Sequence, residues 1–472
     1  MKKILISAFG LVLLGSCAKD FSNKDPKAPS IVPSYTLFSN AEKALSDQLA
    51  SSNVNSGIFR LVVQHWQECT YTDESNYDLG TRNIPQNWWA TYYLTVLQDA
   101  QASKNLIPTD VLDAGIQKNQ LATADILQVY AYYILVATYG NIPYTQALDI
   151  NNPFPTYDDA ATVYADLLSR LNADISALDP GVEAFGSADL LYGGDVSAWI
   201  KFANSLKLKM GMLLADSDPA TAKSTVESAV AAGVLESNDD NALFHYTTST
   251  PNVNPVWTDL VQSGRKDFVA CATLVNALKG LNDPRLNDYF TTDANGDYSG
   301  GDPGASSNYA TFSKPAEALT AADFPYDVLD YAEVEFLLAE AVERGMNVGG
   351  TAESHYNAAI TASMEFWGGS ASDASAYLAQ TSVKYSTAAG DWKEKIGMQK
   401  WIALYNRGFD AWTEQRRLDY PELEAPETAL SDYPIRYTYP TNEQNLNGPN
   451  WKAASAAIGG DEVTTKLFWD KF

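Results

Sequence analysis

Residues 330–344 read DYAEVEFLLAEAVER, and residues 352–366 read AESHYNAAITASMEF. In both stretches apolar residues recur at steps of three and four, which is typical of helices that bury one face. The turn between them begins with Gly345, a residue type that commonly ends helices. Two such helices, with small residues placed between large ones, are typical of a tetratricopeptide-like repeat. The stretch therefore predicts a helix pair formed by Asp330–Arg344 and Ala352–Phe366.

The same periodicity continues on both sides of this pair. Leu127, Tyr130, Ile134 and Ala137 form one further apolar stripe at helical spacing. Helix pairs recur at intervals of roughly 35–40 residues, which favours a repeat array. The predicted fold class is therefore all-α, with tetratricopeptide-like helix pairs forming a scaffold. The other predicted helices are Ser34–Ala50, Ser56–Glu68, Asn87–Leu106, Leu121–Tyr139, Thr156–Leu178, Val196–Ala215, Ala220–Ala232 and Trp392–Arg417.

Three segments interrupt the helical pattern, at residues 70–86, 239–326 and 433–451. They are rich in Gly, Pro, Asn, Ser and Thr and carry isolated aromatic residues. Loops of this length in a compact protein are usually functional or disordered. We expect them to form an irregular, loop-rich ligand-binding subregion over the helical scaffold, centred on residues 239–326 and 433–451.

The N-terminus has the layout of a secretory signal, with two lysines followed by an apolar run over residues 4–14. Residues 14–17, LGSC, resemble a bacterial lipobox, in which Cys17 carries lipid; an ordinary cleaved signal is the alternative. Residues 18–33 are polar and proline-containing, as in flexible tethers. We found no second apolar stretch of transmembrane length, so the lipid is the only expected membrane attachment. The predicted divisions are 1–16 signal peptide, 17–33 lipidated Cys and tether, and 34–472 helical domain.

Charge and motif content narrow the function classes. The net charge is −26, and a basic stripe of the kind that nucleic-acid-binding proteins need is missing. Neutral sugars, or neutral to basic peptides, are compatible with this charge. The sequence contains neither HExxH, CxxC and GxSxG motifs nor a Walker loop, and its three histidines, His65, His245 and His355, are far apart. We therefore predict no catalytic residue, no metal site and no cofactor.

Two weaker patterns concern metal binding and disulfide formation. Asp293-Ala-Asn295-Gly-Asp297 resembles the start of a calcium loop, but the later positions do not fit, and turn chemistry is the favoured reading. Besides Cys17, the chain has only Cys69 and Cys271. Either a disulfide or two buried thiols is compatible with their separation.

Aromatic residues in the polar loops are the candidates for ligand contact. Aromatic faces stack on the C–H faces of sugars and on apolar groups of peptides, while Tyr and Trp also offer a polar atom. Neighbouring Asn and Arg side chains would supply hydrogen bonds. The structural alternative is that these rings pack the loops onto the scaffold. The predicted ligand-binding residues are Tyr71, Asn76, Tyr77, Arg82, Trp257, Arg265, Tyr298, Tyr309 and Phe312.

Several segments together resemble the SusD/RagB family of outer-membrane nutrient-binding lipoproteins. Each motif is short, and their number and order carry the resemblance. The motifs are YGNIPYTQA at 139–147, NDPRL at 282–286, YAEVEFLLAEA at 331–341, WIALYNRGFDAWTEQRR at 401–417, PIRYTYPTNEQNLN at 434–447 and LFWD at 467–470.

The resemblance implies an all-α fold in which four tetratricopeptide-like helix pairs support an irregular ligand-binding subregion. It also implies an outer-membrane lipoprotein, facing the cell exterior, that binds glycans or peptides and delivers them to a partner SusC-like TonB-dependent transporter. The shared motifs suggest architectural roles, with an internal ion pair between Asp283 and Arg285 and a C-terminal loop braced by Arg436 and Glu443. A glycan-active helical enzyme and a repeat scaffold that binds only protein are the alternatives.

Overall fold

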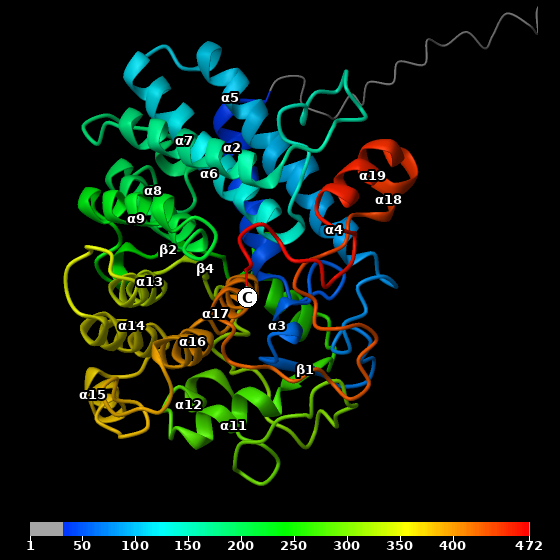
Figure 1. The fold of residues 1–472 in the computed structure, drawn as a ribbon, viewed down its shortest axis with the longest axis vertical. Coiled ribbons are helices and arrows are strands. Elements are labelled where there is room, and N and C mark those ends of the chain that lie inside the picture. The colour runs from blue at the N-terminus through cyan, green and yellow to red at the C-terminus, as the bar shows by residue number, and fades with distance from the viewer. Residues whose placement is uncertain (1–31, 472) are drawn as a thin grey trace, which may run out of the picture. The chain divides into compact units, whose positions relative to one another are not determined.

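Four helix pairs form the scaffold in the part of the chain that the structure describes. The structure is a computed structural model that describes residues 32–471, so the signal, Cys17 and most of the tether lie outside it. Figure 1 shows the pairs following one another along one side of the 34–472 unit. The all-α, tetratricopeptide-like prediction is confirmed. The pairs are α2 (Ser34–Ala50) with α5 (Gln98–Asp110), α6 (Ala114–Tyr139) with α7 (Ala160–Ala177), α8 (Val196–Leu213) with α9 (Pro219–Ala232), and α13 (Tyr331–Glu343) with α14 (Ala352–Phe366).

Short polar side chains fix where these helices begin. The Asp113 carboxylate accepts hydrogen bonds from two backbone N–H groups at the start of α6, and Asp195 does the same for α8. Asp159 caps α7 itself, so that helix begins after the predicted start at Thr156. Thr351 closes a capping box with Ser354 at the start of α14. Such caps satisfy N–H groups that have no partner within the helix.

Helix α6 is the centre of the core. Contrary to the expectation from sequence, this helix of 26 residues is long and apolar enough, by composition alone, to cross a membrane. However, 94% of its most apolar stretch is buried inside the fold, where it contacts α5, α7 and α8. A helix that is apolar on all sides is expected in the core of a large protein. Its hydrophobicity is therefore explained by packing.

Two predicted helices differ most from the structure, because neither forms as one continuous helix. Trp392–Arg417 is divided into α16 (Trp392–Ala403) and α17 (Gly408–Leu418), because Asn406 has a left-handed φ of 71°. Ser56–Glu68 contains only the short α3 (Phe59–Val62), followed by strand β1 (Trp66–Glu68). The helix that packs against α2 is α5.

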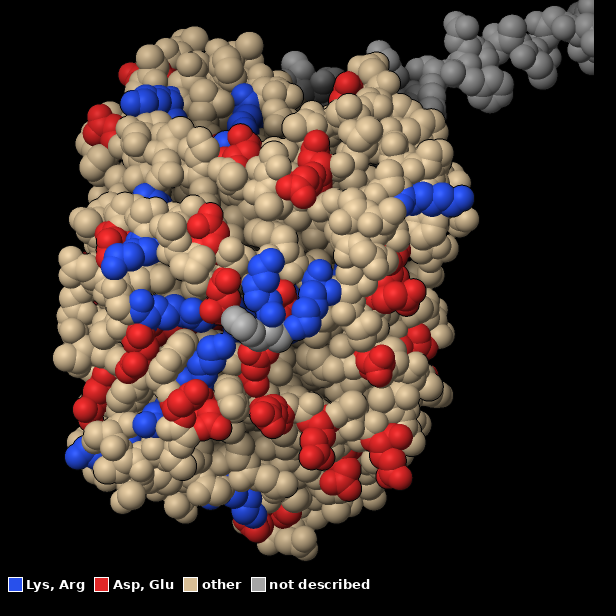
Figure 2. All heavy atoms as spheres, in the orientation of Figure 1, with Lys and Arg blue, Asp and Glu red and all other residues tan. Residues whose placement is uncertain are grey.

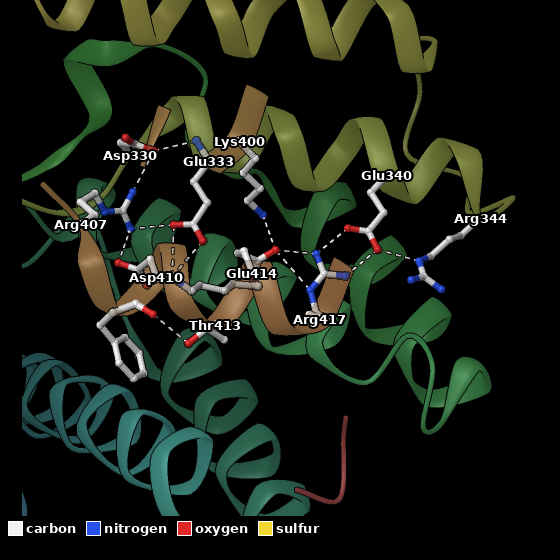
Figure 3. Close-up of polar contacts among 12 residues, drawn as sticks. Asp330, Glu333, Glu340, Arg344, Lys400, Arg407, Asp410, Thr413, Glu414 and Arg417 are labelled. Atoms are coloured by element: carbon white, nitrogen blue, oxygen red, sulfur yellow. Dashed lines mark hydrogen bonds and ion pairs between the residues drawn. The ribbon is translucent and has the colours of Figure 1, made fainter. Parts of the chain in front are cut away.

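A network of buried ion pairs joins α8, α13, α16 and α17 (Figure 3). Lys209 of α8 contacts Glu333 at 2.9 Å and also pairs with Asp410, and all three side chains are fully buried. Arg407 Nη2 lies 2.6 Å from a carboxylate oxygen of Glu333. Farther along, Arg417 binds both Glu340 and Glu414. Each buried acid in this network therefore faces at least one cation.

The residues expected to have architectural roles form ion pairs and hydrogen bonds within the fold. Arg285 Nη2 lies 2.6 Å from Asp283 Oδ2, and both side chains are fully buried. Arg436 Nη1 lies 2.8 Å from Asp461 Oδ1. Glu443 accepts a hydrogen bond of 2.7 Å from the Tyr157 hydroxyl, which ties the C-terminal region to the segment before α7.

The loop-rich segments contain more regular structure than predicted. Two small antiparallel sheets tie them together, because β1 pairs with β3 (Phe268–Ala270) and β2 (Ala242–Phe244) pairs with β4 (Tyr326–Leu329). The remaining elements are α4 (Ile84–Thr91), η1 (Tyr92–Leu97), η2 (Gly186–Ala188), η3 (Asn238–Asp240), α10 (Pro255–Trp257), η4 (Thr258–Gln262), α11 (Ala272–Gly280), α12 (Leu286–Tyr289), α15 (Ala371–Leu378), α18 (Thr441–Leu446) and α19 (Gly448–Ala457).

Candidate functional site

A cavity of about 290 Å³ opens in the loop-rich part of the molecule. One wall is the turn after α2, another is the chain following β1, and a third is π-helical η4 with the segment leading into β3. The lining residues are Ser52, Asn53, Val54, Asn55, Glu68, Thr70, Tyr71, Arg82, Thr258, Asp259, Ser263, Arg265, Asp267 and Phe268.

The pairing of β1 with β3 brings these distant segments together. Glu68 lies opposite Phe268, and the Cys69 N–H donates to the carbonyl of Asp267 at 2.8 Å. The chain that continues from β1 therefore runs beside the chain that enters β3. This contact spans about two hundred residues of sequence, and a pattern in either segment alone does not reveal it.

Three of the predicted ligand-binding residues meet in this cavity: Tyr71, Arg82 and Arg265. The Tyr71 side chain is 69% exposed, so its ring is available to a ligand. Arg265 Nε lies 2.6 Å from Asp267 Oδ2, while Arg82 Nε pairs with Glu74. Each arginine at the cavity thus has its own carboxylate.

Two predicted residues are buried and do not line the cavity. Asn76 is 5% exposed, and its side-chain amide donates to the carbonyls of Thr72 and Gly304. Tyr77 is 1% exposed and packs edge-on against Tyr433. The expectation that they lie on a binding surface is therefore corrected, because their side chains hold the loop onto its surroundings.

The other four predicted residues lie outside the cavity lining. Trp257 ends α10 immediately before the cavity-lining η4 and is half-buried. Tyr298 packs partly buried against the core. The ammonium groups of Lys266 and Lys314 lie 5.8 and 5.3 Å from the centre of the Tyr309 ring. Phe312, like Tyr309, is half-buried.

Acidic and hydroxyl residues of the cavity were missed by the sequence reasoning. Ser52 Oγ donates to Asp259 Oδ2 at 3.0 Å, and burial raises the pKa of Asp259. Burial, with the nearby Glu74 carboxyl, also raises the pKa of Glu68 to about 8. The chain has 58 acidic residues, so a single Asp or Glu carries no signal of its own.

The structure places both sequence patterns that were left open, the calcium-like segment and the two cysteines. Lys279 Nζ lies 2.9 Å from Asp297 Oδ2, and Asp293 accepts hydrogen bonds from the backbone of its own turn, as expected from turn chemistry. Within residues 32–471, no group of acidic, His or Cys side chains has the arrangement to hold a metal ion. Cys69 and Cys271 are buried free thiols at opposite ends of the β1–β3 ladder.

A second hollow of about 410 Å³ lies between α14, α16 and residues 420–422. Tyr420, Met398 and Leu281 contribute apolar surface, and Glu394 and Glu422 contribute carboxylates. Arginine does not line it, and none of the predicted ligand-binding residues does so. It serves below as a matched comparison for the first cavity.

Comparison with known proteins identifies the fold. The SusD-like family profile described as "Starch-binding associating with outer membrane" matches residues 26–440. A chitin-binding protein superposes with a TM-score of 0.81 at 25% identity, covering 93% of this chain and 100% of its own. A chitin-binding SusD homologue from Flavobacterium johnsoniae gives 0.80 at 25% identity, covering 93% and 99%.

A SusD homologue from Bacteroides thetaiotaomicron gives a TM-score of 0.78 at 26% identity, covering 92% of this chain and 99% of its own. A comparison with curated proteins gives no match. The family profile spans most of the sequence, and the helix pairs of the structure agree with it. The chain therefore belongs to the SusD-like family.

Proposed function

We propose that this protein is a surface lipoprotein of the outer membrane that binds a glycan in the Tyr71 cavity and delivers it to a partner TonB-dependent transporter. The observation that carries the binding proposal is the cavity itself, where an exposed aromatic ring stands beside two arginines and several hydroxyl groups. Such a set offers a stacking face and hydrogen-bond donors and acceptors at one place.

The charge arrangement favours a neutral ligand. Arg82 pairs with Glu74, and Arg265 pairs with Asp267, so neither cation requires a ligand anion to balance it. The surface that Figure 2 shows carries many acidic side chains, and they gather in its lower right part. A polyanionic ligand would be repelled by this field, whereas a neutral oligosaccharide would not.

The relatives supply the chemical class to test first. Two of the similar structures are described as chitin-binding, and the family profile is described as starch-binding. We infer neutral oligosaccharides of these two types as the first probes for this protein. The family also motivates the outer-membrane location and the transporter partner, and Cys17 within LGSC motivates a lipid anchor.

Calorimetric titration of residues 34–472 with chitin and starch oligomers tests the binding proposal. Tyr71→Ala should weaken binding about five- to tenfold, because a stacking ring contributes about 1 kcal/mol. Tyr420→Ala, which changes the second hollow, should leave the affinity unchanged. Equal losses in both variants, or full affinity in Tyr71→Ala, would place the ligand elsewhere. Hydrolysis of an oligomer would instead favour a glycan-active enzyme.

The delivery proposal needs its own measurement. A lipidated protein should co-purify with an outer-membrane transporter, and Cys17→Ala should remove it from the membrane fraction. Retention of the Cys17→Ala protein in that fraction, together with the absence of a transporter from the purified material, would contradict this part.

A further inference from the structure

Arg82 presents donors to the cavity that the protein does not use. Its Nε pairs with Glu74, and within the described chain its two terminal nitrogens have no hydrogen-bond partner. The side chain is 35% exposed and lines the cavity. A guanidinium held at Nε keeps its remaining N–H groups in a fixed fork. Arg82 is therefore oriented to donate to a ligand.

The carboxyl group that orients Arg82 has an unexplained buried oxygen. Glu74 has a side-chain exposure of 1%; its Oε1 receives the Arg82 hydrogen bond, while its buried Oε2 lacks a conventional donor. A buried carboxylate oxygen without a donor is costly. The Glu68 carboxyl lies within hydrogen-bonding reach of Glu74. Two carboxyl groups can bond to each other only if one of them carries a proton.

Glu68 is placed so that it can be the protonated member. It lies at the end of β1, is 4% exposed, and its Oε2 accepts a hydrogen bond of 2.8 Å from the Ser75 N–H. It forms no ion pair within the described chain, whereas Glu74 is ion-paired with Arg82. Burial and the Glu74 charge raise the pKa of Glu68 to about 8, in agreement with this assignment.

We propose that Glu68 and Glu74 share one proton, and that this pair positions Arg82 to donate hydrogen bonds to oxygens of a neutral ligand. Glu74 and Glu68 are positioning residues, because they act through Arg82. This inference rests on the proposed glycan-binding function and adds a dependence on protonation to it.

Loss of the shared proton changes the cavity in two ways. Two neighbouring carboxylates repel each other, and the second anion competes with the ligand for the Arg82 guanidinium. The two arginines of the cavity are already paired with Glu74 and Asp267, and the Lys314 ammonium lies over the Tyr309 ring, so none of these cations forms an ion pair with Glu68. Affinity for a neutral oligosaccharide should therefore fall as pH rises. The charged and titratable groups around Glu68 are Cys69, Asp73, Glu74, Arg82, Asp259, Arg265, Asp267 and Lys314.

The test is a calorimetric titration with a neutral oligosaccharide, the chitin or starch hexamer, at about pH 6 and about pH 9. The wild-type protein should bind about tenfold more weakly at the higher pH. In Glu68→Gln the amide can still donate to Glu74 and does not titrate. This variant should therefore bind at about pH 9 as tightly as the wild-type protein binds at about pH 6. Glu74→Gln should bind weakly at both. Glu236→Gln, which changes an exposed partner of Lys201, should behave as wild type.

Equal wild-type affinity at both pH values would overturn the inference while leaving the proposed function intact. Failure of both hexamers to bind at either pH would count against the proposed function instead. The shared proton can then be tested without a ligand, from the midpoint temperature of thermal unfolding. This temperature should fall more steeply with rising pH in the wild-type protein than in Glu68→Gln. Identical midpoint profiles would overturn the inference without any ligand.

Discussion

Two buried glutamates, Glu333 in the ion-pair network of the scaffold and Glu68 in the cavity, have pKa values shifted in opposite directions. Burial alone would raise the pKa of Glu333, but the adjacent charges of Lys209 and Arg407 lower it to about 2. Glu68 is also buried, yet its nearest charged neighbour is another acid, and its pKa rises to about 8. A buried glutamate side chain is thus a carboxylate anion at Glu333 and a protonated carboxyl group at Glu68. The comparison shows that the partner, more than burial, decides the charge.

The largest expected effect comes from removing a cation of the scaffold network. Lys209→Met leaves Glu333 and Asp410 buried with one cation fewer, which should cost about 3–5 kcal/mol of unfolding free energy. Lys201→Met in the same helix, α8, removes only partly exposed ion pairs and should cost less than about 1 kcal/mol. Denaturant unfolding of both variants measures the difference. Similar losses of unfolding free energy in the two variants would mean that the buried network stabilises the fold no more than the exposed ion pairs do.

A smaller effect of opposite sign is expected in the cavity. Because the folded pKa of Glu68 is raised, the folded state retains a proton that the unfolded state releases, and stability falls as pH rises from about 4.5 to about 8. Glu68→Gln removes this penalty and should stabilise the protein by about 2 kcal/mol near pH 8 relative to about pH 5. Chemical denaturation at the two pH values measures it. A destabilised variant at the higher pH would show that Glu68 is ionised as Glu333 is.

The smallest effect is expected at the contact between His355 of α14 and Glu335 of α13. His355 Nδ1 lies 2.7 Å from Glu335 Oε2, and its Nε2 lies 3.2 Å from the carbonyl of Gly349. The hydrogen bond to Glu335 raises the pKa of His355, although burial opposes it. This stabilisation is present below the unfolded pKa and is lost as pH rises through the folded pKa.

His355→Gln should therefore cost about 0.5 kcal/mol at about pH 5.5 and nearly nothing at about pH 9, because the site is partly exposed. Thermal unfolding at the two pH values measures the difference. An equal loss at both values would assign the effect to packing and not to charge.

Secondary structure could be predicted from the sequence where a segment's structure depends on its own residues. The pair α13–α14 follows from apolar spacing and from caps such as Thr351, all of which are local. It could not be predicted where a contact with a distant segment determines the local structure. Strand β1 forms because Phe268–Ala270 lies beside it, and the break before α17 forms where Arg60 donates to the backbone and side chain of Asn406.

The candidate site was predictable to a similar extent. Tyr71, Arg82 and Arg265 were suggested by their residue types in polar loops, and the structure gathers them at one cavity. Asn76 and Tyr77 have the same residue types and the same kind of loop, but they face inward. Sequence pattern does not distinguish the two orientations, because the β1–β3 contact decides which side chains the loop exposes.

Because the two native thiols are buried, a dye can be attached selectively to a cysteine introduced at the cavity. Burial raises the pKa of both Cys69 and Cys271 to about 11, so neither reacts readily with labelling reagents at neutral pH. A protein that begins at Ser34 contains no other cysteine. A single cysteine introduced at Asn53, on the cavity rim, would accept an environment-sensitive dye at one position. Mixtures of unknown glycans can then be screened by a change in emission, without purifying a candidate ligand first.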